Sequence, residues 1–495
     1  MVHFSRQLCR SLSLFFTTLV IHGIVLSASA AEVPEYQDIF PELSLNGSIN
    51  RIQMTESGKH LVALVESATT GQNELFSIRL DNRVATKLHV PLNGGNQVSG
   101  FKISPNGNLV VYRTQFLTDS SDQLFSVSIN GGESVVLNPL LLSNRSVRDF
   151  LISPNSQFVV FQGDIDVDER REVYSVPIQG GTVIKLNSNL INGQSLFGLE
   201  ITPNSDRVIY RKTDPSFKTD LVSVPIGGGS EVRLHPTRTN GASAKSFGTY
   251  SSDGRSVLLG FGYGLFQSED VFIATIDGST PPLHVVKRST TDFKISEAHF
   301  TLDDRFIIFL GKNESATSNN QQHLFRSDLA EDAALVRFTP ILPNALGIRQ
   351  PFLHPDGIHV VYRATPSTSN IFEVFQIPIA GGEPELLSGV SSANYTTNDF
   401  LVSRDGKHIM FNKILLPSFV QQLFVTSFND KKTSAISDTF FTESESTIGY
   451  DIGSSISNSL FLSLNRDAVF VPKVENDELC VPIKVKNGRV AVVCL

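Results

Sequence analysis

Short apolar runs alternate with turn-forming residues along the whole chain. The pattern is clearest in ISPNGNLVVYR from Ile103, where a Ser-Pro-Asn-Gly turn separates two apolar runs. The segment returns as ISPNSQFVVFQ from Ile152 and as ITPNSDRVIYR from Ile201. Pro at the second position and Gly at the fourth suit a type I turn, and the runs between turns are too short for ordinary helices. The pattern therefore predicts antiparallel strands joined by tight turns.

The turn recurs at a nearly constant interval of 49–53 residues. Its fourth residue marks each repeat: Gly58, Gly107, Ser156, Ser205, Gly254, Asp304, Gly357, Gly406 and, more weakly, Asn458. A fixed period of this size is typical of propellers and solenoids, whose units bury their faces against their neighbours.

Two more strands follow in each repeat. The third strand carries a recurring aromatic residue, as in QLFSVSI from Gln123, and Pro177, Pro225 and Pro378 share one phase of it. Because proline cannot donate to a sheet, we expect this strand to bulge or end there. A Gly-Gly turn and a short fourth strand complete the unit. The sequence thus predicts an all-β fold, a single β-propeller of four-stranded antiparallel blades with nine repeats over residues 46–495. An eight-bladed ring with a degenerate ninth unit is the alternative, since four to eight blades are usual.

The Ser-Pro-Asn/Asp-Gly turn, the apolar strand after it and the aromatic strand before Gly-Gly resemble the WD-repeat-like β-propeller of the TolB type. The resemblance covers the propeller repeats, from about residue 46 to the end, without the N-terminal domain of TolB. It implies the propeller fold and a binding role in the cell envelope. Similar propellers precede the catalytic domain of prolyl-oligopeptidase-type peptidases, but no G-x-S-x-G motif occurs in this sequence.

The N-terminus has the pattern of a secretory signal. Arg6 and Arg10 precede an apolar run that ends in Ala28-Ser29-Ala30. We therefore expect a signal peptide over 1–30, a leader over 31–45 and a periplasmic or secreted protein without a transmembrane segment in the mature chain. The net charge of -8 provides no positive field for nucleic acid.

Acidic residues recur at the phase four positions before the turn. We expect this phase to begin the innermost strands, so that symmetry gathers its charged members around the channel mouth: Arg51, Asp149, Glu297, Asp399 and Asp451. Such a group could bind a cation or a basic segment, or only hydrate the channel.

A second acidic group, Asp164, Asp166 and Asp168, alternates in GDIDVDERRE. Alternating carboxylates can converge on Ca²⁺, the one cofactor that the sequence suggests, but the EF-hand pattern is incomplete here. A solvated acidic loop paired with Arg170 and Arg171 is the alternative.

Cys480 and Cys494 are the cysteines left after signal cleavage. They flank the hairpin ELCVPIKVKNGRVAVVCL, and a three-residue loop at 486–488 sets Val485 opposite Arg489 and Cys480 opposite Cys494. An oxidising compartment favours a disulfide in that register. Buried free thiols are the alternative, and a two-residue turn would instead pair Cys494 with Val481.

These observations favour an exported, non-catalytic propeller that binds or scaffolds a protein or peptide partner. Two alternatives remain open. One is a propeller enzyme of the lactonase or polysaccharide-lyase type, acting at the channel mouth. The other is a stand-alone propeller related to the non-catalytic domain of prolyl-oligopeptidase-type peptidases.

Overall fold

The computed structural model describes residues 48–435, apart from short gaps, and several segments after them. The gaps are 68, 83, 93–95, 117–120, 140–144, 238–242, 263–269, 288–292, 314–321, 341–346, 367–370, 390–394, 404, 416–419 and 430, and the later segments are 462–463, 469–470, 473–475, 478–485 and 489–494. The predicted signal peptide and leader, residues 1–45, and the channel-mouth candidate Asp451 lie outside the described residues.

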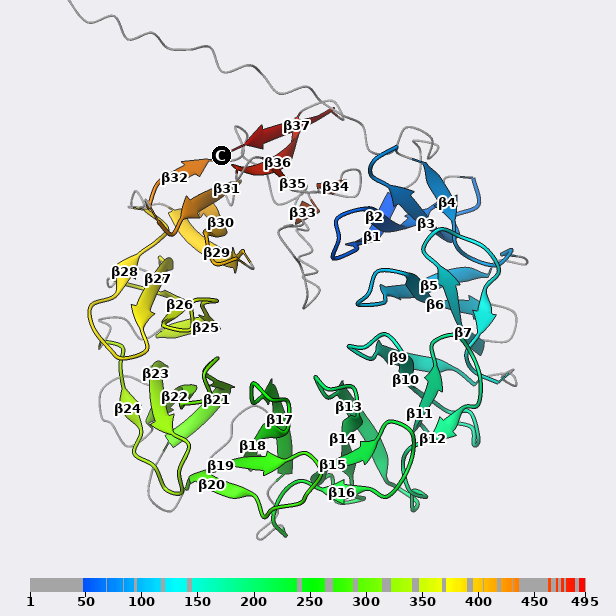
Figure 1. Cartoon of the computed structure of the whole chain (residues 1–495), viewed down its shortest axis with the longest axis horizontal. Coiled ribbons are helices and arrows are strands. Elements are labelled where there is room, and N and C mark those ends of the chain that lie inside the picture. Colours follow the sequence, from blue (N-terminus) through cyan, green and yellow to red (C-terminus); the bar gives the residue numbers. More distant parts are fainter. Residues whose placement is uncertain are drawn as a thin grey trace, which may run out of the picture. The chain divides into compact units, whose positions relative to one another are not determined.

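Eight four-stranded antiparallel sheets follow one another within one compact unit, Tyr36–Leu495, and we number them blade 1 to blade 8 in chain order (Figure 1). The innermost strands are β1 (Ser48–Met54), β5 (Gln97–Ile103), β9 (Val147–Ile152), β13 (Ser195–Ile201), β17 (Ser243–Tyr250), β21 (Phe293–Phe300), β25 (Ile348–Leu353) and β29 (Tyr395–Val402). The second strands are β2 (His60–Glu66), β6 (Leu109–Phe116), β10 (Phe158–Gly163), β14 (Arg207–Thr213), β18 (Ser256–Gly262), β22 (Phe306–Asn313), β26 (His359–Ala364) and β30 (His408–Leu415).

The outer half of each blade has the order predicted from the repeat. The third strands are β3 (Asn73–Arg79), β7 (Ser121–Ser128), β11 (Glu172–Pro177), β15 (Thr219–Pro225), β19 (Asp270–Thr275), β23 (His323–Asp328), β27 (Glu373–Pro378) and β31 (Val420–Ser427). The fourth strands are β4 (Ala85–Lys87), β8 (Val135–Val136), β12 (Ile184–Lys185), β16 (Val232–Arg233), β20 (Leu283–Val286), β24 (Val336–Arg337), β28 (Glu385–Leu386) and β32 (Thr433–Ala435). Three third strands end at the prolines that the sequence singled out, Pro177, Pro225 and Pro378, as expected.

The ninth repeat contributes two smaller sheets among its described residues. One pairs β33 (Leu462–Ser463) with β34 (Val469–Phe470), and the other orders β35 (Lys473–Glu475), β36 (Glu478–Val485) and β37 (Arg489–Cys494). The described strands therefore form an all-β propeller with eight complete blades, and a ninth four-stranded blade is not among them. All regular elements of the described residues are strands, without a helix, and none of these residues forms a helix long and apolar enough to cross a bilayer.

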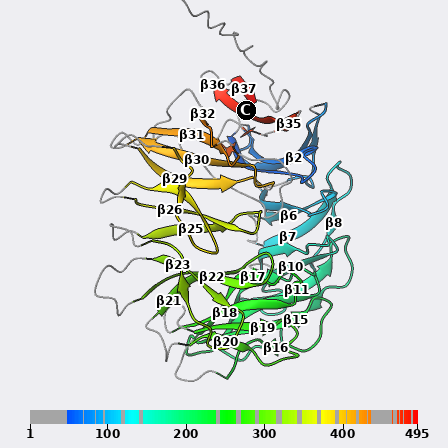
Figure 2. The ribbon, with the colours of Figure 1, turned by 60° about the vertical axis from the view of Figure 1, so that its left-hand side comes forward.

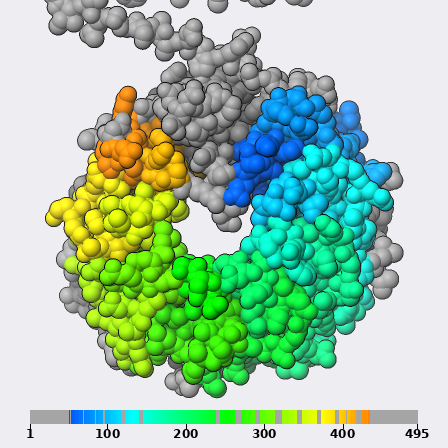
Figure 3. Space-filling model, in the orientation of Figure 1, coloured from blue at the N-terminus to red at the C-terminus, as the bar shows by residue number. Residues whose placement is uncertain are grey.

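The core lies between blades rather than within them. Of eight apolar clusters among the described residues, seven combine two consecutive blades and one lies within blade 1. Leu64 of blade 1 packs with Phe101 of blade 2, for example, and Val361 of blade 7 with Phe400 of blade 8. Inside the blades, aromatic side chains of the second and third strands stack, as Tyr112 does on Phe125 with ring centroids 5.2 Å apart. The succession of blades is also seen from the side (Figure 2), and the space-filling view shows a central opening among them (Figure 3).

The turn after each innermost strand contacts the next blade. At its fourth position Ser156 and Asp304 stand where other repeats have glycine, with φ of 61° and 51°, a conformation that costs a non-glycine residue free energy. Each side chain accepts a hydrogen bond from the preceding blade: Asn106 N donates to Ser156 Oγ at 3.0 Å, and Ser252 N donates to Asp304 Oδ2 at 2.9 Å. These bonds offset the backbone strain and tie neighbouring turns together.

Candidate functional site

Every innermost strand of the eight described blades carries a β-bulge at about the same phase. The register with the second strand shifts between Ile49 and Arg51, Val98 and Gly100, Val147 and Asp149, Phe197 and Glu200, Ser246 and Tyr250, Ile295 and Glu297, Arg349 and Phe352, and Thr397 and Asp399. A bulge adds an unpaired residue and re-aims the side chains beside it. In the propeller it also interrupts the free edge that faces the central opening, so a partner strand cannot extend the sheet there.

The bulge corrects the position expected for the channel-mouth residues. Arg51, Asp149, Glu297 and Asp399 do not begin their strands but lie in the middle of β1, β9, β21 and β29, at the bulge. Asp149 is exposed, whereas the other three are partly buried. Whether they bind anything remains a prediction.

The sequence analysis did not identify the residue that directly precedes this phase on the innermost strands. Arg148, Phe197, Arg349 and Asn398 are exposed at that phase, because the extra residue shifts which side chain is presented to solvent. A signal for the shift exists in the sequence. Buried residues on these strands are three apart, as in Val98 and Phe101 or Ile295 and Ala298, where an unbroken strand would space them by two.

Second strands send polar side chains to the bulge of the next blade. Arg113 Nη1 donates to Val147 O at 2.8 Å and to Arg148 O at 2.6 Å, and Gln162 Nε2 donates to Leu196 O. Because a bulge leaves backbone carbonyls without their ladder partners, these donors satisfy groups that burial would otherwise penalise. The bulges are therefore fixed by contacts between blades.

Charges at the bulges are mixed and partly desolvated. Burial, and then the neighbouring Arg211, lower the pKa of Lys245, while Glu297 opposes the shift. Burial raises the pKa of Asp122, which Arg113 and Arg148 partly counteract. Lys245 also lies over the Phe247 ring, 5.0 Å from its centroid. The inner strands therefore combine cations, acids and aromatic rings rather than one charge type.

Among the residues whose burial the structure describes, two phenylalanines are exposed on innermost strands, Phe197 of β13 at 39% and Phe352 of β25 at 41%. Arg211 lies over the Phe197 ring, 5.4 Å from its centroid. Large apolar side chains in contact with water on innermost strands are candidates for partner contact.

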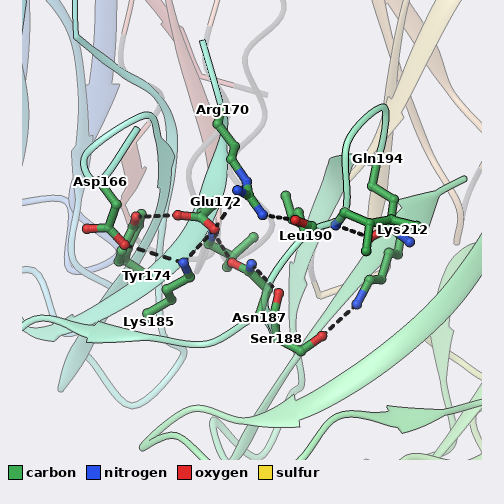
Figure 4. Close-up of polar contacts among 12 residues, drawn as sticks. Asp166, Arg170, Glu172, Tyr174, Lys185, Asn187, Ser188, Leu190, Gln194 and Lys212 are labelled. Atoms are coloured by element: carbon green, nitrogen blue, oxygen red, sulfur yellow. Dashed lines mark hydrogen bonds and ion pairs between the residues drawn. The ribbon is translucent and has the colours of Figure 1, made fainter. Parts of the chain in front are cut away.

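The acidic loop of blade 3 does not gather its carboxylates. Ser146 N donates to Asp164 at 2.6 Å, Lys185 Nζ pairs with Asp166 at 3.3 Å, and Asp168 accepts only from the backbone N of Glu169. Lys185 also pairs with the buried Glu172 at 2.5 Å, to which Tyr174 donates at 3.1 Å (Figure 4). The three carboxylates do not form the shared site that the calcium hypothesis needs, because each has a different partner. Arg170 does not pair with the three aspartates; its Nε lies 3.8 Å from Glu172 Oε1, and its Nη2 donates to Leu190 O (Figure 4).

No group of three His, Cys, Asp or Glu side chains that could hold a metal is found in the described part of the chain. On the innermost strands, His299 and Glu297 approach to 3.7 Å. A larger group, His354, Asp356 and His359, lies at the turn of blade 7, with Nδ1 of His359 2.6 Å from Asp356. It supports that turn, because His354 Nε2 also bonds Gly406 O of blade 8 at 3.1 Å.

Comparison with known proteins gives fold likeness only. No protein-family model and no curated protein matches the chain. Solved structures that resemble it include a prolyl endopeptidase (14% identity, TM-score 0.45, 78% of this chain and 54% of that one) and dipeptidyl peptidase 4 of Porphyromonas gingivalis (9%, 0.47, 87% and 57%). A third is the propeller domain of the Trilobed protease of Pyrococcus furiosus (12%, 0.37, 69% and 98%). The chain thus spans little more than half the length of the first two. The TolB-type resemblance stays a resemblance of the repeats.

Proposed function

We propose that the chain is an exported, non-catalytic β-propeller that binds a protein or peptide partner at the inner-strand bulges. The observation that carries this proposal is the exposure of Phe197 and Phe352 on innermost strands whose other apolar side chains are largely buried. Aromatic side chains dominate the free energy of protein association when a partner desolvates them. The N-terminal signal pattern supports export, and the pairing of each carboxylate with structural partners in blade 3 favours binding over metal-assisted catalysis.

The test compares partner capture by three forms of the mature chain, residues 31–495. We expect capture from the native compartment with the parent and its loss in the variant F197A/F352A. The matched control is F217A, which removes a phenylalanine that is 87% exposed but lies in the loop between β14 and β15. Equal capture by all three forms would refute the role of the bulges.

Export has its own test, which does not depend on the partner. Sequencing the N-terminus of the protein recovered from the native host should begin at Ala31. An N-terminus at Met1 would contradict export through a cleaved signal. The two alternatives are a propeller enzyme and a stand-alone propeller related to the non-catalytic domain of prolyl-oligopeptidase-type peptidases. Both share the propeller fold, but no arrangement of the described residues favours either.

A further inference from the structure

Blade 7 sets two arginines directly opposite each other beside its bulge. Arg349 of β25 pairs with Arg363 of β26 in the antiparallel register. Side chains in such a pair have Cβ atoms about 4.5–5.5 Å apart, and like charges there are destabilising. A fold that keeps this pair bears a cost in free energy.

The other blades provide an internal comparison. At the same phase their pairs are Arg51 with Leu64, Gly100 with Arg113, Asp149 with Gln162, Phe197 with Arg211, Lys245 with Gly260, Glu297 with Leu310 and Asp399 with Asn412. Among the eight described blades, blade 7 alone opposes two cations. In blade 2 the second-strand arginine, Arg113, donates hydrogen bonds to the next blade although the residue opposite it is Gly100. Arg349 is therefore not needed for such contacts.

An aromatic ring and blade 8 hold the pair in place. The guanidinium carbons of Arg349 and Arg363 lie 5.5 Å and 5.4 Å from the centroid of the Phe372 ring. Phe372 is tied to β29, since its N donates to Thr396 Oγ1 at 2.9 Å and its O accepts from Thr397 N at 2.8 Å. Arg363 Nη1 donates to Thr397 O at 3.1 Å. The site thus lies where blades 7 and 8 meet, at their inner strands (Figure 1).

The nearby negative charge is too small to neutralise both arginines. Asp399 interacts with Arg363 electrostatically, but it accepts hydrogen bonds from Gln350 Nε2 and from Phe400 N. No carboxylate of the described residues forms an ion pair with either arginine. Arg363 Nε is buried without an acceptor. Burial lowers the pKa of Arg363; Asp399 opposes that shift and Arg349 adds to it. Two guanidinium groups beside one carboxylate, which is already hydrogen-bonded, leave a net positive charge at this site.

The backbone at the pair is also strained. Gln350 has φ of 52°, an uncommon conformation for a non-glycine residue, and it follows Arg349 directly in the bulge. Strain of this kind persists only where surrounding contacts impose it, and it gathers at binding sites. The bulge also sets Phe352 on the same face as Arg349, because their partners Val361 and Arg363 are two residues apart on β26.

We propose that Arg349 and Arg363 bind a carboxylate in an acidic segment of a protein partner, with Phe352 contacting an apolar side chain beside it. The proposal rests on the proposed function and names the chemistry of its partner. Guanidinium forks match carboxylates in bidentate geometry, and a bound carboxylate would neutralise the repulsion. The exposed Phe352 next to the cations favours a peptide with an apolar residue over a uniformly anionic saccharide.

The test uses the thermal midpoint of the mature chain with and without hexaglutamate peptide, at ionic strength held constant with sodium chloride. We expect the peptide to raise the midpoint of the parent, through binding to the folded state. In R349Q the midpoint without peptide should rise, because the repulsion is gone, and the affinity for the peptide should fall about tenfold. The control is R337Q, which removes an exposed arginine from β24 of blade 6 and should leave the response unchanged.

The possible outcomes separate the proposals. An unchanged peptide response in R349Q, or a lower midpoint of R349Q without peptide, would overturn the anion site. Stabilisation by polygalacturonate but not by hexaglutamate would reject the peptide class. If R349Q still captures the partner that F197A/F352A loses, the anion site is wrong and the proposed binding function stands. If hexaglutamate binds but the parent captures no partner, the anion site stands and the proposed binding function is wrong.

Discussion

Gly180, in the turn between β11 and β12, lies directly against Val135 of β8 in the preceding blade. A Cβ atom at Gly180 would stand 2.7 Å from Val135 Cγ1, closer than real Cβ contacts allow. The backbone there has φ of 87°, so glycine is required both by the turn and by the neighbouring blade. The same contact recurs in other blades, between Gly131 and Thr86 and between Gly278 and Val232.

We therefore expect G180A to destabilise the protein by about 2–4 kcal/mol, from the positive φ and from overpacking together. The measurement is the midpoint of urea unfolding. V135A should recover the steric part of the loss in a double-mutant cycle, since Val135 is 40% exposed and cheap to truncate. G227A is the control, because Gly227 has open space around its position and no positive φ. Equal effects of G180A and G227A would show that the contact is not tight.

The Gly-Gly turn shows which features could be predicted from the sequence and which could not. Its positive φ was predictable, because a tight hairpin imposes that conformation locally. Its contact with the preceding blade was not, because Gly180 and Val135 meet only when two repeats pack. The innermost strands likewise combine a feature that was predicted with one that was not. The repeat fixed the turn beside Ile103, whereas the extra residue before Gly100 changed which side chains are exposed, and Arg349 was missed for that reason.

The hydrogen bonds of Asp356 predict a loss of stability in acid. Partial burial acts to raise the pKa of Asp356, but hydrogen bonds from His359 Nδ1 and from two backbone N–H groups outweigh it and lower the pKa to about 2. A carboxyl group whose pKa is lowered by folding stabilises the protein above its ordinary pKa of about 3.9 and loses that effect as pH falls through the folded value.

D356N should therefore be less stable than the parent at pH 6, and the difference should shrink as the pH falls from about 4 to about 2. Thermal midpoints of both proteins across this range measure it. D168N, which removes one carboxylate from an exposed loop of blade 3, controls for the change in net charge. A parent–D356N difference that does not vary with pH would contradict the pairing.

Arg113 links blades 2 and 3 and predicts a second effect on stability. Its Nε donates to Ser99 Oγ at 2.8 Å, and its Nη1 donates to the carbonyl oxygens of Val147 and Arg148 at the bulge of β9. R113L leaves the carbonyl of the fully buried Val147 without a donor, so we expect a loss of about 2–4 kcal/mol in unfolding free energy. Leucine fills this phase in blades 1 and 6, which makes the substitution sterically acceptable. R233L, at an exposed position of β16, should cost less than about 0.5 kcal/mol; equal losses would mean that the bonds of Arg113 contribute little.

The last hairpin adopts the register predicted from its loop. β36 and β37 pair with Val485 opposite Arg489 and Cys480 opposite Cys494, as a three-residue loop requires. Neighbouring Cβ atoms across such strands are about 4.5–5.5 Å apart, close to the range that a disulfide spans. The bridge itself remains a prediction, and it depends on export to an oxidising compartment.

If the bridge forms, it closes a 15-residue loop and should stabilise the chain end by about 3 kcal/mol, mainly through the entropy of the unfolded state. Thiol titration of the unfolded, unreduced mature protein should then find no reactive thiol, because signal cleavage removes Cys9 and the bridge consumes the other two. Reduction should expose two thiols and lower the unfolding midpoint of the parent, whereas C480S/C494S should not respond to reductant. Two reactive thiols before reduction would leave the hairpin with the predicted register but without the covalent bond.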